Sequence, residues 1–549
     1  MIKVTGCGKE AVLRNGSHYL DAAAALAGDN GGVICLAYNE AEGSVHELFD
    51  EVTDGSDIRF LTYADSEGKR AYRRTACLML YKAVYEETGD EDIDVEFNTG
   101  GNYFVRINGH KVTESFCRKL KERMDRYRDL DIPVEKHFVS VSDVVKLLEE
   151  KGLDKAAHRL DYRISSKISY YSLDGFKEIF TGQLCVSAGC IKYFGLQPYE
   201  GGLLLRFPET ENFDSLCDVK TPGPLFRTQS SSQKWAENIG IESLSDLNDA
   251  ICDGRTDNLI LMQEAIFEKR LGDVASEIAG KKIKFIFLAG PSSSGKTTTA
   301  YRLAIQLRAY GLEPKIISAD NYFFGGDDRP RLPDGKPDLE SIRAVDTELF
   351  NNDMEKLLNG ETVELPSFNF VAARREYRGN RVTLNGLKVL IVEGIHCLNP
   401  KFSEKIPEDR KYRIYVSALT PLSVDAINPI PTSECRLLRR IVRDYRTRGY
   451  SAAQTIAQWT EVRKGEEENI FPYQDNADVV INSALIYELA VIKGYVEPLL
   501  FGIGRKEPEY AEARRLLKFL SCVLTLPADI VPRNSVIREF IGGSCINEE

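Results

Sequence analysis

The chain has 549 residues, of which 43% are hydrophobic and 28% charged, a balance that supports several folded domains with ordinary apolar cores. Its formal net charge of −12 argues against a DNA-binding or general nucleic-acid-binding protein, because affinity for a phosphate backbone requires clustered positive charge. The apolar runs are too short to span a bilayer, and twelve scattered cysteines without a C-x-x-C pair favour reduced thiols over a zinc site. We therefore expect a cytoplasmic protein with no membrane segment.

The first 220 residues predict two α+β units, because short strand patterns alternate there with helical ones. One unit covers residues 1–60 and the other residues 61–220. The expected elements are strands at 2–5, 32–38, 94–97 and 201–208 and helices at 19–26, 70–87, 142–151 and 175–180.

Residues 221–281 predict a helical linker, in which a polar break at 230–234 precedes helical patterns from about 243 to 279. From residue 282 onward strands alternate with helices, which predicts an α/β domain over 282–483 with a parallel sheet covered on both faces. Residues 484–549 predict a helical extension that ends in an extended segment at 532–543. The strands expected in the α/β domain are 284–288, 315–318, 388–392, 413–416 and 478–481.

A strand that runs into a phosphate-binding loop is the most specific signal in the chain. Gly290, Gly295, Lys296 and Thr297 match G-x-x-x-x-G-K-[ST], with an apolar run before the loop and a helical pattern after it. In such a loop, backbone N–H groups and the N-terminus of the next helix surround phosphate oxygens. Lys296 can bridge the outer phosphates, and the Thr297 hydroxyl can hold Mg²⁺. The residues expected to contact a nucleoside triphosphate are Gly290, Ser292, Ser293, Ser294, Gly295, Lys296, Thr297 and Thr298.

Two acidic residues follow buried strands of the predicted sheet. Asp320 comes after the strand at 315–318, and Glu393 ends the strand at 388–392. Because parallel strands end at one edge of a sheet, both carboxylates are expected beside the phosphate loop. Asp320 can then accept a proton from an acceptor hydroxyl, while Glu393 can orient Mg²⁺ directly or through water. A single acid in such a position is more often a helix cap or a surface turn, but two acids after a phosphate loop favour the functional interpretation.

An arginine-rich helix is predicted near residues 435–448. Arg436, Arg439, Arg440 and Arg443 follow three- and four-residue spacing and share one helical face. Arginines that close over a triphosphate neutralise the charge of the transferred phosphoryl group, often as part of a mobile lid. The alternative is a solvated basic face, which is the more common meaning of a charge run.

Residues 284 to about 483 resemble the uridine kinase/phosphoribulokinase family of phosphate-loop kinases. The resemblance rests on the phosphate loop, on the segments 318–323, 365–370 and 392–396, and on the arginine helix through Gln454. It implies that Asp320 is the catalytic base and that Lys296, Arg440 and Arg443 act on the phosphates. The nucleoside contacts that the resemblance implies are Asp320, Tyr322, Asp346, Phe368, Phe370, Arg436 and Gln454. The base-contacting histidine of uridine kinases is missing after Phe370, so the sequence leaves the base open.

The first 220 residues resemble two domains found in threonyl-tRNA synthetases. Residues 1–60 resemble a TGS domain, and residues 61–220 resemble the second additional, editing-type domain. Arg74 and Leu78 stand where the resemblance implies the histidines of an H-x-x-x-H element, and Cys185 and Cys190 lie in a later element without histidine. Hydrolysis of aminoacyl esters is therefore not expected, and the catalytic domains for tRNA charging are missing from this sequence.

The sequence as a whole favours an ATP- or GTP-dependent, Mg²⁺-requiring nucleoside kinase that forms a 5′-monophosphate. Phosphorylation of another small acceptor, such as a sugar phosphate, is one alternative, and a nucleotide-dependent regulator is another. The first 220 residues either gate the kinase or bind RNA or a second copy of the chain. The local cluster of Arg70, Arg73 and Arg74 keeps RNA contact open despite the acidic chain.

Overall fold

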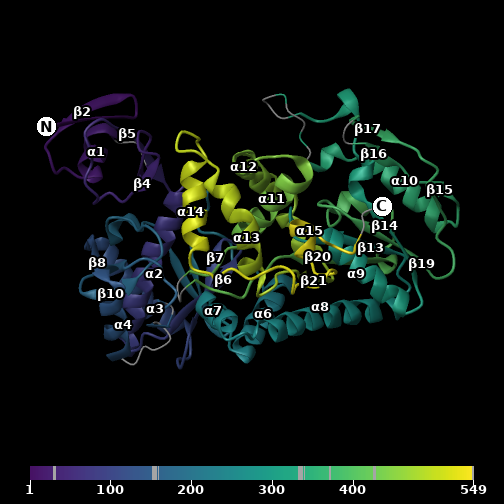
Figure 1. Cartoon of the computed structure of the whole chain (residues 1–549), viewed down its shortest axis with the longest axis horizontal. Coiled ribbons are helices and arrows are strands. Elements are labelled where there is room, and N and C mark those ends of the chain that lie inside the picture. Colours follow the sequence, from purple (N-terminus) through teal and green to yellow (C-terminus); the bar gives the residue numbers. More distant parts are fainter. Residues whose placement is uncertain are drawn as a thin grey trace.

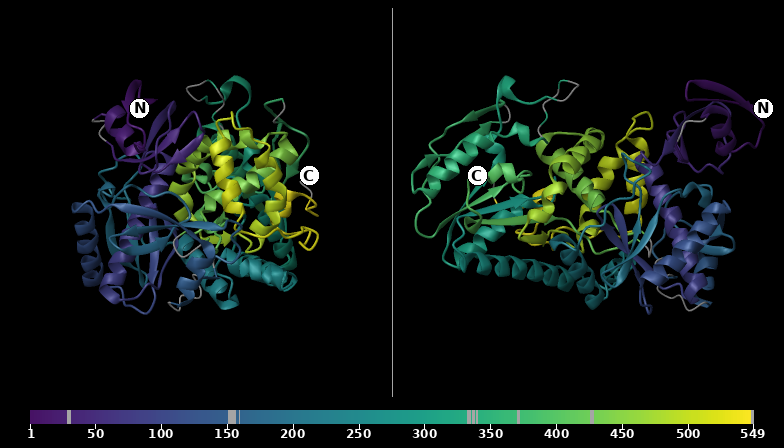
Figure 2. Two further views of the ribbon diagram at one scale, coloured as in Figure 1. Left: turned by 60° about the vertical axis from the view of Figure 1, so that its left-hand side comes forward. Right: turned by 180° about the vertical axis from the view of Figure 1, so that it is seen from behind.

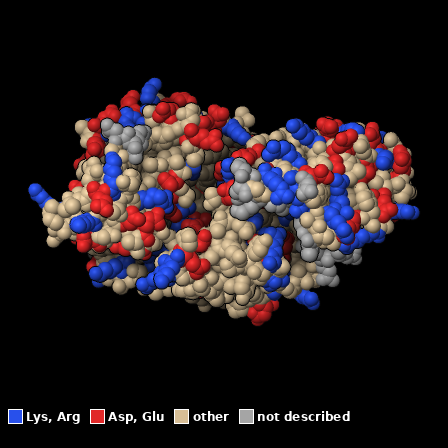
Figure 3. All heavy atoms as spheres, turned by 90° about the horizontal axis from the view of Figure 1, so that it is seen from above, with Lys and Arg blue, Asp and Glu red and all other residues tan. Residues whose placement is uncertain are grey.

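The computed structural model describes residues 1–546 except 29–31, 151–156, 159, 332–334, 336–337, 339, 370–371 and 425–427. The chain folds into two lobes, with the first 220 residues in one and the phosphate-loop region in the other (Figures 1 and 2). Seen from above, a hollow separates the lobes, and acidic and basic side chains are interspersed on both (Figure 3). Across the described ranges, every helix is too short or too polar to cross a membrane.

The N-terminal unit is a five-stranded sheet, in the order β2-β1-β5-β3-β4, covered by one helix. Strand β1 pairs antiparallel with β2 and parallel with β5. The helix buries Tyr19, Ala22, Ala23 and Leu26, which lie three or four residues apart and so share one face. The bounds are β1 (Ile2–Gly6), β2 (Lys9–Leu13), α1 (Tyr19–Leu26), β3 (Ile34–Asn39), β4 (Ser44–His46) and β5 (Ser56–Thr62).

The second unit is built around helix α2 (Ser66–Thr88), most of whose inner residues are buried. Two sheets pack with it, one in the order β11-β12-β7-β6 and the other β10-β9-β8. The other elements are β6 (Ile93–Thr99), β7 (Asn102–Ile107), α3 (Glu114–Asp129), β8 (Val134–Ser140), α4 (Val141–Glu150), β9 (Lys167–Leu173), β10 (Phe176–Ile179), β11 (Gly195–Tyr199) and β12 (Gly202–Arg206).

The helix expected at 175–180 is wrong, because this segment forms strand β10, paired antiparallel with β9. Asp174 and Gly175 both have positive φ, at 47° and 79°, and they form the two-residue turn between the strands. Positive φ at both central positions matches the twist of a tight hairpin. Six residues are also too few to form a stable helix without tertiary support.

The linker helices are α6 (Pro224–Ile239), α7 (Leu244–Cys252) and α8 (Thr256–Ala279). The polar break expected at 230–234 is wrong, because these residues lie inside α6. Pro224 begins this helix, where a missing N–H costs nothing, and Phe226, Gln229 and Ala236 are buried. Helix α8 runs along the lower edge of the second lobe (Figure 1).

The second lobe contains a five-stranded sheet in the order β14-β19-β13-β20-β21, with every neighbouring pair parallel. The parallel α/β fold expected from the sequence is therefore confirmed. Its strands are β13 (Phe285–Ala289), β14 (Glu313–Ser318), β19 (Lys388–Glu393), β20 (Lys411–Ser417) and β21 (Val479–Asn482). Two small hairpins pair β15 (Val363–Glu364) with β18 (Arg381–Val382) and β16 (Ser367–Asn369) with β17 (Arg374–Glu376). The helices between the strands are α9 (Lys296–Ala309), α10 (Thr347–Leu358), α11 (Thr432–Arg448) and α12 (Ala452–Asn469).

The C-terminal helices are α13 (Glu488–Phe501), α14 (Tyr510–Leu520) and α15 (Arg538–Ile541). The extended segment expected at 532–543 is wrong, because α15 forms there and Val536, Ile537 and Phe540 are buried. Residues from the linker helices, the sheet and this C-terminal part all belong to one hydrophobic core. Segments that precede the phosphate-loop sheet in the sequence and segments that follow it therefore both pack against the sheet.

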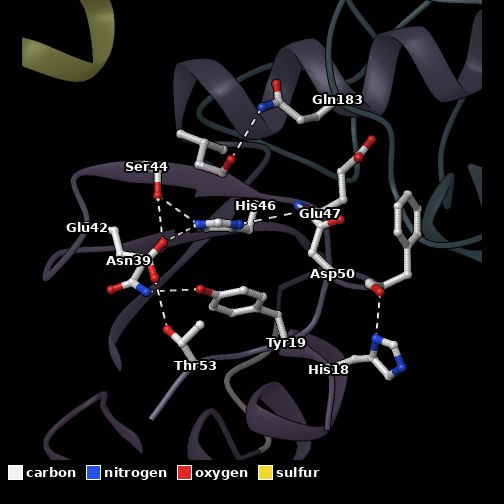
Figure 4. A network of polar contacts seen from close by, with 12 residues as sticks. His18, Tyr19, Asn39, Glu42, Ser44, His46, Glu47, Asp50, Thr53 and Gln183 are labelled. Atoms are coloured by element: carbon white, nitrogen blue, oxygen red, sulfur yellow. Dashed lines mark hydrogen bonds and ion pairs between the residues drawn. The ribbon is translucent and has the colours of Figure 1, made fainter. Parts of the chain in front are cut away.

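Buried charges lie at the contacts between these units. Glu47 is fully buried and accepts hydrogen bonds from the Tyr171 hydroxyl at 2.7 Å and the Leu184 N–H at 2.8 Å, and it pairs with Lys136. Gln183 reaches from the second unit towards the strand that carries His46 (Figure 4). These contacts fix the N-terminal unit against the second unit.

The two lobes meet at Arg515 of α14. Its guanidinium pairs with Glu434 of α11 at 2.8 Å and with Glu512 at 2.7 Å, and it lies 4.0 Å from Glu67 of α2. A helix of the N-terminal lobe and the arginine helix therefore share one cation.

Candidate active site at the phosphate loop

The phosphate loop lies between β13 and α9, at the carboxyl edge of the sheet. At Gly290 a Cβ atom would fall 2.2 Å from the carbonyl oxygen of Val416, so only glycine fits where the loop leaves the strand. Gly295 has φ of +82°, which favours glycine, and Ser293 also has positive φ, at 58°. The local backbone therefore requires the residues that the sequence pattern supplies.

The loop carries buried hydroxyl groups. Ser293 and Ser294 are 3% and 0% exposed, and no described residue makes a hydrogen bond to either Oγ. Lys296 Nζ donates to the carbonyl of Pro291 at 3.1 Å, which curls its side chain back along the loop. Buried hydroxyls that lack protein partners fit a loop built to surround a polar ligand.

The two predicted acids lie beside this loop. The strand register aligns Glu393 with Leu288 of β13 on one side and with Ser318 of β14 on the other. Asp320 follows Ser318 in a short 3₁₀ turn. Burial raises the pKa of Glu393 to about 7, against the opposing charge of Lys296, and burial also raises the pKa of Asp320. The Glu393 carboxyl group can therefore take up a proton near neutral pH.

A third acid at this edge was not predicted from the sequence. Glu340 packs against Gly465, where a Cβ atom would lie 2.5 Å from the Glu340 Cβ. Burial raises the pKa of Glu340 to about 7, and the neighbouring carboxylate of Glu466 adds to this shift. Glu340 lies in an irregular segment, which gave no strand pattern that could have placed it at the sheet edge.

Three arginines of α11, Arg436, Arg439 and Arg440, contact the phosphate loop. Arg436 donates to the carbonyl of Ser292 at 3.1 Å, and Arg440 donates to the Ser292 hydroxyl at 2.7 Å. Arg443 pairs with the buried carboxylate of Asp444 at 2.8 Å. Arg439 is fully buried and pairs with Glu488 of α13. These guanidinium groups therefore bind carboxylates and loop oxygens. They do not form the solvated basic face that was the alternative interpretation of their spacing.

Comparison with known proteins agrees with this geometry. Residues 285–488 match the sequence profile of the Phosphoribulokinase / Uridine kinase family. The uridine kinase of Mycoplasma pneumoniae is 31% identical over 202 residues, which cover 37% of this chain and 85% of that protein. The uridine kinase of Mycoplasma genitalium is 30% identical over 177 residues, which cover 32% of this chain and 74% of that protein. The chain belongs to the phosphoribulokinase/uridine kinase family. Membership makes its C-terminal part a phosphotransferase.

Tyr322 and Asp346, two nucleoside contacts that the family resemblance implied, both have structural partners. The Tyr322 ring is buried against Phe350, and its hydroxyl donates to Asp353 at 3.2 Å, so Tyr322 forms part of the core. Asp346 caps α10 by accepting from the Leu349 N–H. It also pairs with Arg375 at 2.8 Å.

Phe368 in β16 lies beneath a guanidinium group. The Arg329 guanidinium is 5.0 Å from the centre of the Phe368 ring, and the Arg375 guanidinium is 5.7 Å from the centre of the Phe324 ring. Phe370, the other predicted aromatic contact, lies outside the described residues. Two arginines therefore accompany the aromatic residues of this region.

Two lid-side expectations differ from the arrangement found. Arg436 is 1% exposed, with its guanidinium held by the buried carboxylate of Glu466, so it faces the phosphate loop and no open pocket. The Gln454 side chain accepts from the Ser451 N–H in a capping box that begins α12. The partner of Arg436 lies 30 residues away in the sequence, whereas Ser451 and Gln454 form the local S-x-x-Q pattern of a capping box.

Two more carboxylates contact the phosphate loop and were not predicted. Glu466 of α12 accepts from the Ser292 N–H at 3.0 Å, and Glu539 of α15 accepts from the Thr298 N–H at 3.1 Å. Both residues are distant from the loop in sequence and belong to no local motif, so only the fold brings them there.

Metal ligands at this edge would be oxygens. The candidate donors are the Thr297 hydroxyl and the carboxylates of Asp320 and Glu393, which suit Mg²⁺. Within the described part of the chain, no cluster of three or more acidic, histidine or cysteine side chains forms a preformed metal site.

The surroundings of Arg74 in the N-terminal lobe are closely packed. Arg74 donates to the carbonyl of Gln183 and to Asn428, each at 3.4 Å, and a Cβ atom at Gly182 would lie 2.4 Å from its guanidinium carbon. Leu78 and Cys185 are fully buried. The hydrogen-bonded thiol of Cys185, together with burial, raises the pKa of Cys190 well above its ordinary value. The thiols of Cys185 and Cys190 therefore stay protonated, and the packing leaves no room for a side chain at Gly182 beside Arg74.

Proposed function

We propose that the C-terminal part of this chain transfers a phosphoryl group from ATP or GTP to the 5′-hydroxyl of a nucleoside. The observation that carries the proposal is the convergence of the phosphate loop, Asp320 and Glu393 at one edge of the parallel sheet. Phosphoryl transfer needs an oriented hydroxyl and neutralised phosphate oxygens, and this edge offers groups for both.

Each group has a role in the proposed reaction. Asp320 holds the acceptor hydroxyl in line and takes its proton, a role that its raised pKa supports. Lys296 pairs with the outer phosphates, while Arg440 and Arg443 neutralise charge on the transferred group. The remaining donor contacts come from the loop backbone and from the hydroxyls of Ser292, Ser293, Ser294 and Thr298.

A magnesium ion, when bound, would neutralise phosphate charge at the same edge. Thr297 and Glu393 would hold it, the first through its hydroxyl and the second directly or through water. Glu393 must be ionised for this purpose, so with its pKa at about 7 it binds the ion better as the pH rises.

The acceptor side supports a second candidate, an acceptor that already carries an anionic group. Arg329 and Arg375 lie over Phe368 and Phe324, where an uncharged nucleoside would need only aromatic and hydroxyl contacts. Guanidinium groups favour phosphate or carboxylate. A sugar phosphate would satisfy this chemistry.

The experiment that tests both candidates is an acceptor panel with Mg-ATP and Mg-GTP. We expect a nucleoside to yield its 5′-monophosphate, detected by liquid chromatography. Product only from sugar phosphates would establish the second candidate. Nucleotide binding without phosphorylation of any acceptor would identify a nucleotide-dependent regulator.

For residues 1–220 we propose a regulatory role, with a TGS-like unit at 1–60 and an editing-like unit at 61–220. The shared cation Arg515 supports it, because Glu67 of the N-terminal lobe and Glu434 of the arginine helix both lie near this guanidinium. Arg515→Met should alter donor KM if the lobes are coupled. A tRNA mobility shift at low salt, lost in Arg70→Ala, would instead favour RNA binding.

A further inference from the structure

A segment that follows α14 in the chain lies against the phosphate loop. We call residues 528–546 the C-terminal strap; it contains α15, which packs against α11 and contacts α9 (Figure 1). Glu539 of the strap accepts hydrogen bonds from the Thr298 N–H at 3.1 Å and from the Thr298 hydroxyl at 2.7 Å. Val536 fills the space in front of Gly295, where a Cβ atom would lie 2.5 Å from its Cγ1.

The position that Glu539 occupies is one that suits phosphate. The N–H groups in the first turn of α9 have no partner within the helix, and the helix dipole favours an anion there. Thr298 lies in this turn, directly after Lys296 and Thr297. A carboxylate that uses both donors of Thr298 satisfies them as a phosphate oxygen would. A second anion in the same place would meet strong repulsion at this short range.

The strap is held in place from several sides. Arg446 of α11 donates to the carbonyls of Glu539 at 2.7 Å and Phe540 at 3.0 Å. Arg302 of α9 donates to the carbonyl of Asn534 at 3.3 Å. The same two helices that border the phosphate loop therefore hold the strap across it.

We propose that Glu539 sets the affinity for the triphosphate donor by occupying the phosphate position at Thr298 until the donor displaces it. The inference rests on the proposed function only in that the loop binds a triphosphate. The donor must then break the two hydrogen bonds of Glu539. Only chains in which the carboxylate has left Thr298 can bind the donor, so the apparent affinity for the donor falls in proportion to the fraction of such chains.

The test compares the full-length chain with Glu539→Gln and with Asp529→Asn. Asp529 is an exposed acid of the same strap, so its variant removes the same charge away from the loop. Calorimetric titrations use Mg-ATP and, as a probe without a base, inorganic triphosphate with Mg²⁺. We expect Glu539→Gln to bind both about tenfold more tightly than the wild-type chain, because a charge-assisted contact no longer competes. Asp529→Asn should match the wild type.

A second measurement needs no variant and guards against a misfolded one. Hydrogen exchange of residues 535–541 in the wild-type chain should rise when Mg-ATP is added, because the donor displaces the strap. Equal affinities in all three chains together with unchanged exchange would overturn the role of Glu539 while leaving donor binding intact. If no chain bound either triphosphate, the assignment of the phosphate loop would fail, and this inference with it.

Discussion

Glu466 and Glu47 are both fully buried carboxylates, but one lies at the phosphate loop and the other at a contact between domains. Glu466 is paired with Arg436 and caps the Ser292 N–H, so its charge supports the loop. Glu47 joins the two N-terminal units through Tyr171 and Leu184. The comparison shows that the C-terminal lobe uses buried charge to build its site, whereas the N-terminal lobe uses it to hold units together.

The two carboxylates also differ in the direction of their pKa shifts. Burial by itself would raise the pKa of Glu466, but Arg436 holds it below its ordinary value. Burial raises the pKa of Glu47, and Lys136 only partly opposes this. Glu466 therefore adds stability above the pKa of an unfolded glutamate, near 4.5, and loses it as the pH falls. The contribution of Glu47 is present at low pH and is lost as the pH rises.

The largest expected effect tests the catalytic side of the comparison. Asp320→Asn should lower kcat about 10³-fold, because the neutral amide cannot accept the hydroxyl proton, while donor binding stays close to wild type. The measurement is steady-state turnover on whichever acceptor the panel identifies. Asp328→Asn, an exposed acid nearby, serves as the control and should change kcat less than twofold. Full turnover by Asp320→Asn would refute the assignment of the base.

Glu466→Gln should lower the free energy of unfolding by about 3 kcal/mol, because it leaves the Arg436 guanidinium buried without a counter-charge. It should also weaken donor binding, since the Ser292 end of the loop loses its support. Urea denaturation measures the first effect and calorimetry the second. Glu467→Gln, an exposed neighbour in α12, is the matched control. A loss no greater than that of Glu467→Gln would mean that the pair contributes no net stability.

Glu393→Gln should change how stability depends on pH. The carboxyl group, with its pKa raised to about 7, favours the folded state while protonated, so this contribution is lost between about pH 4.5 and 7. The variant lacks this loss, and its stability relative to wild type should rise by about 2.5 kcal/mol from pH 5 to pH 8. Urea denaturation in the presence of EDTA measures the difference. Glu313→Gln, at the opposite end of the sheet, should show no such drift, and a parallel drift in both variants would contradict the assignment.

The smallest effect concerns Glu47. Glu47→Gln should gain stability relative to wild type as the pH rises from 5 to 8, because the variant need not bury a charge. Its kcat should stay within twofold of wild type, since Glu47 touches only the N-terminal units. Denaturation at a series of pH values, with the exposed Glu51→Gln as reference, tests the first statement. A drift towards lower stability would show that Lys136 dominates this site.

Sequence patterns identified the phosphate loop, the parallel sheet and the two strand-end acids, because these depend on local spacing and on strand direction. They failed at 175–180 and 230–234, where a hairpin turn and buried contacts decide the local structure. They could not indicate Glu466 or Glu539, since nothing near either residue marks it as a partner of the loop. Residues that act through long-range packing leave no periodic signal.

The position of the C-terminal strap has a consequence for how the protein is synthesised. The ribosome delivers the phosphate loop about 240 residues before Glu539, its partner in the strap. Until the strap emerges, Thr298 and the space in front of Gly295 stay uncovered, and the shared core lacks Val536 and Phe540. The second lobe can therefore complete its packing only after the strap has been synthesised, and a chain truncated before the strap would lose both the core side chains of Val536 and Phe540 and the carboxylate at its loop.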